Sequence, residues 1–211
     1  MMISTRVLKA EDPRAIDAAL DVLSSGGLVA FPTDTVYGVG ALAFDSSAVE
    51  RVFAAKGRDA AKALPILLAD VESASRVAEP LPDGAQKLAK AFWPGPLTLV
   101  VRKLACVPEA VSQGNTIGLR VPDHPVAIAL LRACGPLAAT SANPSGGPNP
   151  LSADEVVSGL GDKIDLVLDG GKTPGGRPST VVDCTVEPPV LVREGPVSLA
   201  SILAVLGVGG G

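Results

Sequence analysis

Apolar residues recur along the chain in two patterns, one typical of helices and one typical of buried strands. Ile16, Ala19, Leu20 and Leu23 fall at i, i+3, i+4 and i+7, which predicts one apolar face of a helix. Asp12 stands just before this segment and is followed by a proline, so we expect it to cap the helix start. Short uninterrupted apolar runs elsewhere predict strands that are covered on both faces.

The same reasoning assigns most of the chain. Further helices are expected over residues 46–56, 83–92, 126–134, 154–159 and 199–206. Strands are expected over residues 28–31, 65–69, 97–101, 116–122, 137–139, 166–168, 180–183 and 190–193. Helices and strands alternate without a strict βαβ rhythm, and no low-complexity linker divides the sequence. We therefore expect an α/β fold, an open twisted mixed sheet with packed helices, in a single domain over residues 1–211.

One polar stretch directly follows the first predicted strand. Residues 31–40 read Phe-Pro-Thr-Asp-Thr-Val-Tyr-Gly-Val-Gly and hold the only tyrosine of the chain. Polar loops at strand ends are where α/β proteins place ligands, so this stretch is predicted to form one wall of a small-molecule site. Gly38 and Gly40 are expected to let the chain turn tightly, and Tyr37 to pack beneath the loop. Thr33 and Thr35 also suit an edge strand.

Other polar residues gather at predicted strand ends. They are Lys56, Arg58, Lys62, Arg120, Thr140, Ser141, Asn143, Ser179, Thr180 and Arg193. Each has an ordinary alternative: Arg58 suits a helix end, Ser141 and Asn143 suit a turn cap, and Arg193 can pair with Glu194 at the surface. Jointly, several cations and hydroxyls with few acids indicate a site for a polyphosphate and a small polar metabolite.

Composition and charge narrow the function classes. The chain of 211 residues is 47% hydrophobic and carries a net charge of −4; this disfavours disorder and an autonomous nucleic-acid-binding domain. Cys106, Cys134 and Cys184 are scattered, and the single histidine, His124, fits a structural place at a helix start, so no permanent metal centre is expected. The N-terminal residues lack a signal-peptide core and no run matches a membrane span; we expect a cytoplasmic protein.

Seven ordered motifs give a more specific indication. They are Pro32–Gly38 (PTDTVYG), Lys56–Arg58 (KGR), Trp93–Thr98 (WPGPLT), Arg120–Pro122 (RVP), Thr140–Asn143 (TSAN), Pro178–Asp183 (PSTVVD) and Arg193–Gly195 (REG). In order and spacing, over residues 10–206, this set resembles the YrdC-like family of threonylcarbamoyl-AMP synthases. The resemblance implies a concave, basic cleft in the α/β fold.

The resemblance also implies an activity and partners. Members of that family are nucleotidyltransferases that join L-threonine, bicarbonate or CO2, and ATP into threonylcarbamoyl-AMP and pyrophosphate. The product serves N6-threonylcarbamoyladenosine synthesis at position 37 of tRNA, so a threonylcarbamoyl transferase is an implied partner. Mg²⁺ would accompany ATP, mostly held by phosphates and water, and Asp34 would contact the ion through water. Direct contact with tRNA or double-stranded RNA is a further implied contact.

Roles for individual residues follow from the same resemblance. The implied catalytic residues are Lys56, Arg58 and Arg120. The implied threonine contacts are Thr35, the backbone of Ala139, and Ser179. The implied ATP contacts are Arg58, Lys62, Thr116, Arg120, Ser141, Asn143, Asn149 and Arg193.

The chain departs from the family pattern at two positions. Asp59 replaces a common proline, and Leu67 stands where many members have a histidine near the threonine pocket. The sequence stops before the extra C-terminal domain of longer members, so it resembles the short form. Two alternatives stay open: a double-stranded RNA- or tRNA-binding protein of the same fold, and a carbamoyl-transfer paralogue.

Overall fold

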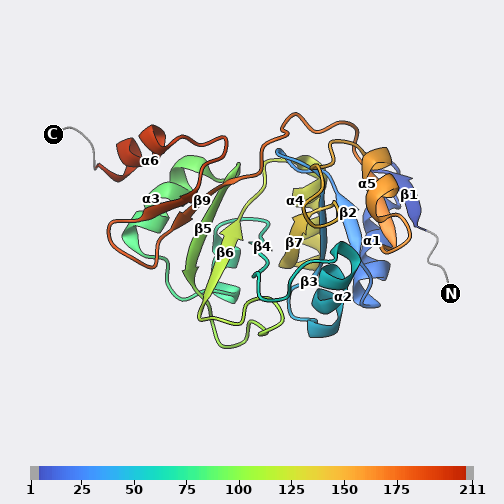
Figure 1. Cartoon of the computed structure of the whole chain (residues 1–211), viewed down its shortest axis with the longest axis horizontal. Coiled ribbons are helices and arrows are strands. Elements are labelled where there is room, and N and C mark those ends of the chain that lie inside the picture. The colour runs from blue at the N-terminus through green and yellow to red at the C-terminus, as the bar shows by residue number, and fades with distance from the viewer. Residues whose placement is uncertain (1–4, 208–211) are drawn as a thin grey trace.

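Ten strands form a single mixed sheet that runs through the computed structural model from one end to the other (Figure 1). The structure describes residues 5–207; the N-terminal residues 1–4, on which the signal-peptide prediction partly depends, lie outside that range. The strands are β1 (Arg6–Lys9), β2 (Val29–Phe31), β3 (Gly38–Leu42), β4 (Ile66–Leu67), β5 (Leu97–Arg102), β6 (Thr116–Arg120), β7 (Leu137–Ser141), β8 (Leu166–Asp169), β9 (Thr180–Asp183) and β10 (Val190–Arg193). The helices are α1 (Ala15–Ser24), α2 (Ser46–Lys56), α3 (Asp83–Phe92), α4 (Pro125–Cys134), α5 (Ala153–Leu160), α6 (Leu199–Leu206) and the 3₁₀ helix η1 (Glu72–Arg76).

The sheet order confirms the predicted mixed α/β architecture. The strands lie in the order β1-β8-β2-β3-β7-β4-β6-β5-β9-β10. Four neighbouring pairs are parallel (β1/β8, β8/β2, β4/β6 and β5/β9), and the other five are antiparallel. Antiparallel partners place a strand start beside a strand end, so polar residues from both kinds of terminus meet over the middle of the sheet.

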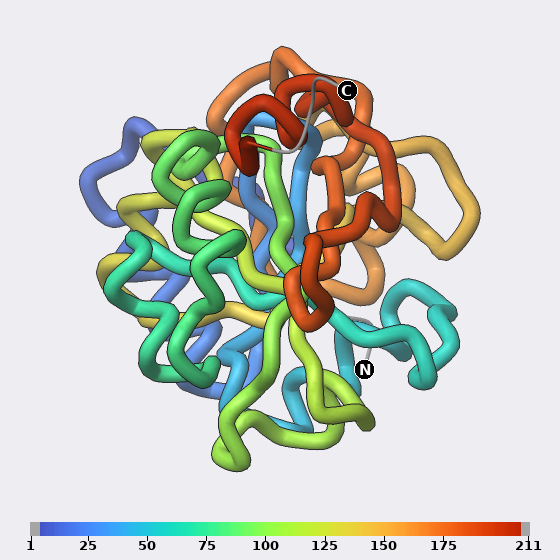
Figure 2. Tube along the Cα trace, turned by 90° about the vertical axis from the view of Figure 1, so that its left-hand side faces the viewer, coloured from blue at the N-terminus to red at the C-terminus, as the bar shows by residue number. Residues whose placement is uncertain are grey.

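Apolar side chains cover both faces of the sheet. In β2, Val29 and Phe31 belong to one cluster with Ala15 and Leu131 of α1 and α4, whereas Ala30 belongs to a larger cluster on the other face. This division follows from the two-residue period of a strand. In Figure 1, α1, α2, α4 and α5 lie beside the half of the sheet around β2 and β3, and α3 and α6 lie at the other end. A second view, turned by 90°, shows the same helices stacked around the strands (Figure 2).

Most predicted elements are confirmed, and the errors have identifiable causes. Helix α1 begins at Ala15, after an N-cap Arg14 without a side-chain cap. Asp12 instead accepts a hydrogen bond from the Arg14 backbone N–H at 2.9 Å, in the turn before the helix. The strands predicted over 65–69 and 116–122 are shorter than expected, and β1 and η1 were not predicted. No helix within residues 5–207 is long and apolar enough to cross a membrane.

The prediction that Gly38 and Gly40 form a tight turn is wrong. Both glycines lie in β3, which pairs with β2 on one side and β7 on the other. A Cβ atom at Gly40 would lie 2.9 Å from the carbonyl oxygen of Ala138 in β7. The glycine therefore serves close strand packing, and the turn is made by the residues before it.

Candidate functional site

A cavity of about 230 Å³ lies over the centre of the sheet. Five strands that are consecutive in sheet order, β3, β7, β4, β6 and β5, each contribute a residue to its lining, and Ser179 contributes from just before β9. The lining residues are Thr33, Thr35, Val36, Gly38, Arg58, Pro65, Leu67, Thr98, Arg120, Ala139, Thr140, Ser141, Asn149, Pro178, Ser179 and Arg193. Within the described residues 5–207, this lining holds three arginines and no acid.

The loop between β2 and β3 is held in shape by one of its own side chains. The Thr33 hydroxyl accepts hydrogen bonds from the backbone N–H groups of Thr35 (3.2 Å) and Val36 (3.3 Å). It donates its proton to the carbonyl oxygen of Val36 at 2.7 Å. Short polar side chains commonly fix turns in this way. The loop is therefore prefolded, and the Thr33 and Thr35 side chains are buried, with 3% and 2% exposure.

The Thr35 hydroxyl lies between Thr33 and Arg120. It is 2.9 Å from the Thr33 hydroxyl, and either of the two can be the donor of that bond. Arg120 Nη1 donates to the Thr35 oxygen at 3.1 Å. A hydroxyl has one proton and two acceptor positions, so these two partners leave Thr35 one hydrogen-bonding position for a ligand in the cavity.

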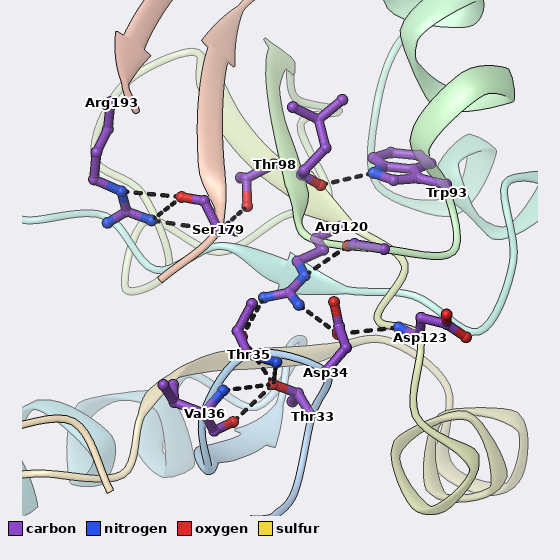
Figure 3. A network of polar contacts seen from close by, with 12 residues as sticks. Thr33, Asp34, Thr35, Val36, Trp93, Thr98, Arg120, Asp123, Ser179 and Arg193 are labelled. Carbon is purple, nitrogen blue, oxygen red and sulfur yellow. Dashed lines mark hydrogen bonds and ion pairs between the residues drawn. The ribbon is translucent and has the colours of Figure 1, made fainter. Parts of the chain in front are cut away.

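Arg120 is the central side chain of this network (Figure 3). Its Nε donates to the carbonyl oxygen of Gly95 at 3.0 Å, and its Nη2 pairs with Asp34 Oδ1 at 2.5 Å. Asp34 Oδ1 also accepts from the backbone N–H of Asp123 at 3.0 Å, while the buried Oδ2 has no hydrogen-bond partner among residues 5–207. Burial lowers the pKa of Arg120 and the Asp34 charge opposes this effect. Three of the five guanidinium N–H donors are engaged, leaving two for a ligand.

A second polar group lies on the opposite side of Arg120 in Figure 3. Arg193 donates to the carbonyl oxygen of Ser179 through Nε (3.1 Å) and Nη2 (2.7 Å). The Ser179 hydroxyl lies 2.8 Å from that of Thr98. Arg193 thus positions Ser179, and neutral hydroxyls separate this guanidinium from Arg120.

Two arginines at the cavity have no carboxylate partner. Within residues 5–207, neither Arg58 nor Arg193 forms an ion pair, and Arg58 Nη2 donates only to the carbonyl oxygen of Ala63, at 3.2 Å. Burial lowers the pKa of both, and the charge of Arg58 lowers the pKa of Arg193 further. Uncompensated guanidinium groups that repel each other are relieved by an anion between them.

The structure brings most of the predicted site residues together. Those in the cavity lining are Thr35, Arg58, Arg120, Ala139, Ser141, Asn149, Ser179 and Arg193. Lys56, Lys62, Thr116 and Asn143 do not line it. Lys62 lies in the exposed loop after α2, and Thr116 lies at the start of β6, roughly 13 Å along the strand from Arg120. Their predicted ATP contacts, like the predicted concave basic cleft, stay predictions.

Lys56 has a structural environment that the prediction did not foresee. Lys56 as a whole is 4% exposed. Its ammonium donates to the carbonyl oxygens of Ser141 and Asn143, both at 2.5 Å. Burial, together with the neighbouring Arg58, lowers the pKa of Lys56 to about 8. The Asn143 side chain in turn donates to the carbonyl oxygen of Gly147 at 2.7 Å. Lys56 and Asn143 therefore do not line the cavity. They hold the end of β7 at Ser141 and the loop that follows it, which carries Asn149.

Two residues at the site were missed from the sequence. Thr98 lies within a quoted motif but had no assigned role. Gly175 gave no sequence signal, because it is one of several glycines in its segment. In the structure, a Cβ atom at Gly175 would lie 1.9 Å from the carbonyl oxygen of Thr35. The next residue, Gly176, donates its N–H to that same oxygen at 3.0 Å. The segment 170–178 therefore lies directly against the Thr35 loop.

Two residues with weaker sequence predictions are also placed. His124 is the N-cap of α4, and its Nδ1 accepts from the Val126 N–H at 3.3 Å, which confirms the structural prediction. Tyr37 is fully buried, and its hydroxyl donates to the carbonyl oxygen of Gly171 at 2.7 Å, as expected for a packing role. Within residues 5–207, no cluster of three metal-ligating side chains is present.

Comparison with known proteins identifies the family. A family model described as Sua5/YciO/YrdC, telomere recombination, matches residues 21–195. The chain belongs to the Sua5/YciO/YrdC family. A relative from Pyrococcus abyssi, named threonylcarbamoyl-AMP synthase, is 46% identical over 194 residues, covering 91% of this chain and 57% of the relative. A Mycobacterium tuberculosis relative, named putative threonylcarbamoyl-AMP synthase, is 44% identical and covers 92% and 90% of the two chains.

A solved structure in this family has the same fold. The crystal structure of P. abyssi Sua5 complexed with L-threonine superposes with a TM-score of 0.90 at 44% identity, covering 98% of this chain and 61% of that chain. The Sua5/YciO/YrdC assignment therefore holds for both sequence and fold. This chain spans little more than half the length of the P. abyssi protein.

Proposed function

We propose that this chain is a threonylcarbamoyl-AMP synthase that uses L-threonine, bicarbonate or CO2, and ATP. The observation that carries the proposal is the pairing of Thr35 and Arg120 in one cavity. The Thr35 hydroxyl keeps one hydrogen-bonding position, Arg120 keeps two N–H donors, and both groups are buried and mutually hydrogen-bonded. An amino acid has the complementary groups, an ammonium donor and a carboxylate acceptor. The family relatives that bear the same name support this assignment.

The rest of the cavity suits threonine and a nucleotide in adjacent positions. Val36 and Leu67 line the same cavity and offer apolar contact for the substrate methyl group. Arg58 and Arg193, which lack carboxylate partners, offer charge for ATP phosphates. Ser141 and Asn149 add polar contacts at the cavity. The amino acid therefore binds near the β2–β3 loop, and the triphosphate lies toward Arg58 and Arg193.

The proposed reaction needs no covalent nucleophile from the protein. The threonine amine forms a C–N bond to CO2, one C–O π bond opens, and an amine proton passes to water, which gives a carbamate. A carbamate oxygen then bonds to the α-phosphorus of ATP, and the bond from this phosphorus to the bridging oxygen of pyrophosphate breaks. The protein must hold two mutually repelling anions in line and stabilise charge on the phosphate. Arg58 and Arg120 are the residues proposed for this, with Lys56 acting through the loop that it holds.

Magnesium is proposed to enter with ATP as part of the substrate. At the loop, Asp34 Oδ1 is occupied by Arg120 and the Asp123 N–H, and one oxygen, Oδ2, is unpartnered. A single carboxylate oxygen suits contact through water better than a protein-held Mg²⁺ site. The ion would supply charge neutralisation of the phosphates, and ATP chemistry of this kind fits the cytoplasm.

The test is pyrophosphate release from Mg-ATP, measured with threonine and bicarbonate added singly and together, with detection of the adenylate by mass spectrometry. Release should require both co-substrates and yield threonylcarbamoyl-AMP. Equal release without threonine would overturn the substrate assignment. Activity with carbamoyl phosphate would favour a carbamoyl-transfer paralogue. Salt-sensitive RNA affinity without ATP and no adenylate would favour an RNA-binding protein. The product of the active enzyme would pass to a threonylcarbamoyl transferase acting on tRNA.

A further inference from the structure

A large cavity lies away from the candidate site. It has a volume of about 710 Å³ and is bounded by α3, the segment before η1, and the turn after α3. A second cavity of about 340 Å³ adjoins it and shares Ala69, Asp70 and Arg132 with it. We call the two together the η1 groove. It takes no part in the function proposed above.

The larger part of the η1 groove is mainly apolar. Leu81, Ala89, Trp93, Pro94 and Val121 line it, and no described side chain of this chain fills it. Trp93 is held in place because its Nε1 donates to the carbonyl oxygen of Leu97 at 2.7 Å. This part of the groove therefore offers a preformed apolar wall to the body of a ligand.

The smaller part of the groove is polar and carries two arginines. Within residues 5–207, neither Arg76 nor Arg132 forms an ion pair or a side-chain hydrogen bond. Arg76 lies against Gly135, where a Cβ atom would be 3.3 Å from its Nη1. Gly135 has a φ of +84°, so both its conformation and this close approach favour glycine. The arginine is thus placed at the end of α4 without an acceptor.

The charges facing the groove leave an excess of positive charge. Four cations line it, Arg76, Lys87, Lys90 and Arg132, against two acids, Asp70 and Glu72. The Asp70 carboxylate already accepts from the backbone N–H and hydroxyl of Ser73, at 2.9 and 2.6 Å. Those bonds and the Arg132 charge lower the pKa of Asp70. An anionic group is therefore the complement of the polar end.

We propose that the η1 groove binds a small amphipathic carboxylate, with its apolar body beside Trp93 and its carboxylate at Arg76 and Arg132. The two parts share a wall, so one ligand can occupy both. A purely apolar ligand would make no contact with the charge of the two exposed guanidinium groups, and a small polar anion would leave the apolar wall in water. An amphipathic monoanion satisfies both parts.

The single tryptophan of the chain makes a direct test available. Trp93 emission is measured while decanoate, kept below its micelle concentration, is added to the full chain. Decanol, which has the same apolar length and no charge, is the comparison ligand. Emission should change saturably, with an apparent Kd at least fivefold lower for decanoate than for decanol. Equilibrium dialysis with labelled decanoate detects binding that leaves the emission unchanged.

Charge variants test the polar end. Arg76→Gln combined with Arg132→Gln should raise the Kd for decanoate at least tenfold, whereas Arg6→Gln, on the far edge strand β1, should leave it unchanged. Thermal melting of each variant confirms that it is folded. The proposal fails if dialysis detects no binding, if decanol binds as well as decanoate, or if the double variant binds with unchanged Kd.

Discussion

The candidate site and the η1 groove differ in size and in the state of their charged groups. The candidate site has about 230 Å³, and the two parts of the η1 groove have about 710 and 340 Å³. In the candidate site, Thr33, Thr35 and Arg120 are buried and hydrogen-bonded to one another or to the backbone. In the η1 groove, Arg76 and Arg132 are exposed and form no ion pair within residues 5–207. Preorganised polar groups, and not volume, therefore distinguish the cavity proposed for the reaction, because their ordering is completed on folding.

The largest effect should come from removing the buried cation. Arg120→Met leaves Asp34 buried without its partner; the two side chains are 8% and 13% exposed in the pair. We expect the free energy of unfolding to fall by about 3–5 kcal/mol and turnover to be lost. Urea unfolding followed by Trp93 emission measures the first, and pyrophosphate release the second.

A double variant separates the two consequences. Arg120→Met with Asp34→Leu removes both charges, so most of the stability should return while turnover stays absent. If the double variant is as unstable as the single one, the ion pair is not what makes this region differ from the groove.

The second prediction concerns a cation that no carboxylate neutralises. Arg58→Ala should lower turnover about a hundredfold, the usual effect of losing one charged transition-state contact of about 3 kcal/mol. Because Arg58 bonds only to loop carbonyls, the melting temperature should hardly change. Arg102→Ala, at the far end of β5, is the matched control. Unaltered turnover in Arg58→Ala would remove this residue from the site.

The third prediction concerns the Thr35 hydroxyl. Thr35→Val keeps the shape and removes the hydroxyl, so a charged group of the bound threonine loses a hydrogen-bond partner. A hydrogen bond to a charged group contributes about 1.5–3 kcal/mol, and the Kd for threonine should rise roughly 10- to 100-fold. Calorimetry with threonine measures this, with ATP affinity as the internal control. Equal losses for both ligands would indicate a general loop defect.

The smallest predicted effect concerns Lys56 and pH. Its pKa is lowered from 10.5 to about 8, so between these values the folded protein loses a proton that the unfolded chain keeps. The unfolded state then binds more protons, and the free energy of unfolding contributed by this group rises with pH across that window. Below pH 8, the ammonium stays charged in the folded protein, and its burial lowers the free energy of unfolding by the full amount.

The corresponding measurement compares wild type with Lys56→Met in urea at about pH 7 and about pH 10. The difference in free energy of unfolding should shift by about 1–3 kcal/mol in favour of wild type at the higher pH. A pH-independent difference would show that the ammonium keeps its proton among the carbonyl oxygens.

Local patterns predicted most of the fold. Helix α3 has its predicted bounds, since an amphipathic run and a following Trp-Pro-Gly-Pro turn define it. Strand β3 was missed because two of its five residues are glycines. Its pairing with β2 and β7 cannot be predicted from the pattern of apolar residues. Strand β1 was missed because its RVLK sequence is largely exposed at the sheet edge.

The site was predictable in its residue types but not in its contacts. Motif order placed Thr35, Arg58 and Arg120 correctly at one cavity. That Lys56 faces backbone carbonyls, and that Gly175 lies against Thr35, depends on segments 85 and 140 residues apart in sequence. Such contacts are decided by how the sheet assembles, so a single sequence carries no local sign of them.

The turn after α3 joins the two concave regions. Gly95 accepts from Arg120 Nε and donates its N–H to Val121 at 2.8 Å, while Pro94 and Val121 line the groove. A ligand that shifts this turn would change the affinity of the cavity for threonine by some factor. Thermodynamic reciprocity then requires threonine to change the affinity for the groove ligand by the same factor. Both factors can be measured by titrating each ligand in the presence of the other, and a factor of one in both titrations would mean that the two regions are not coupled.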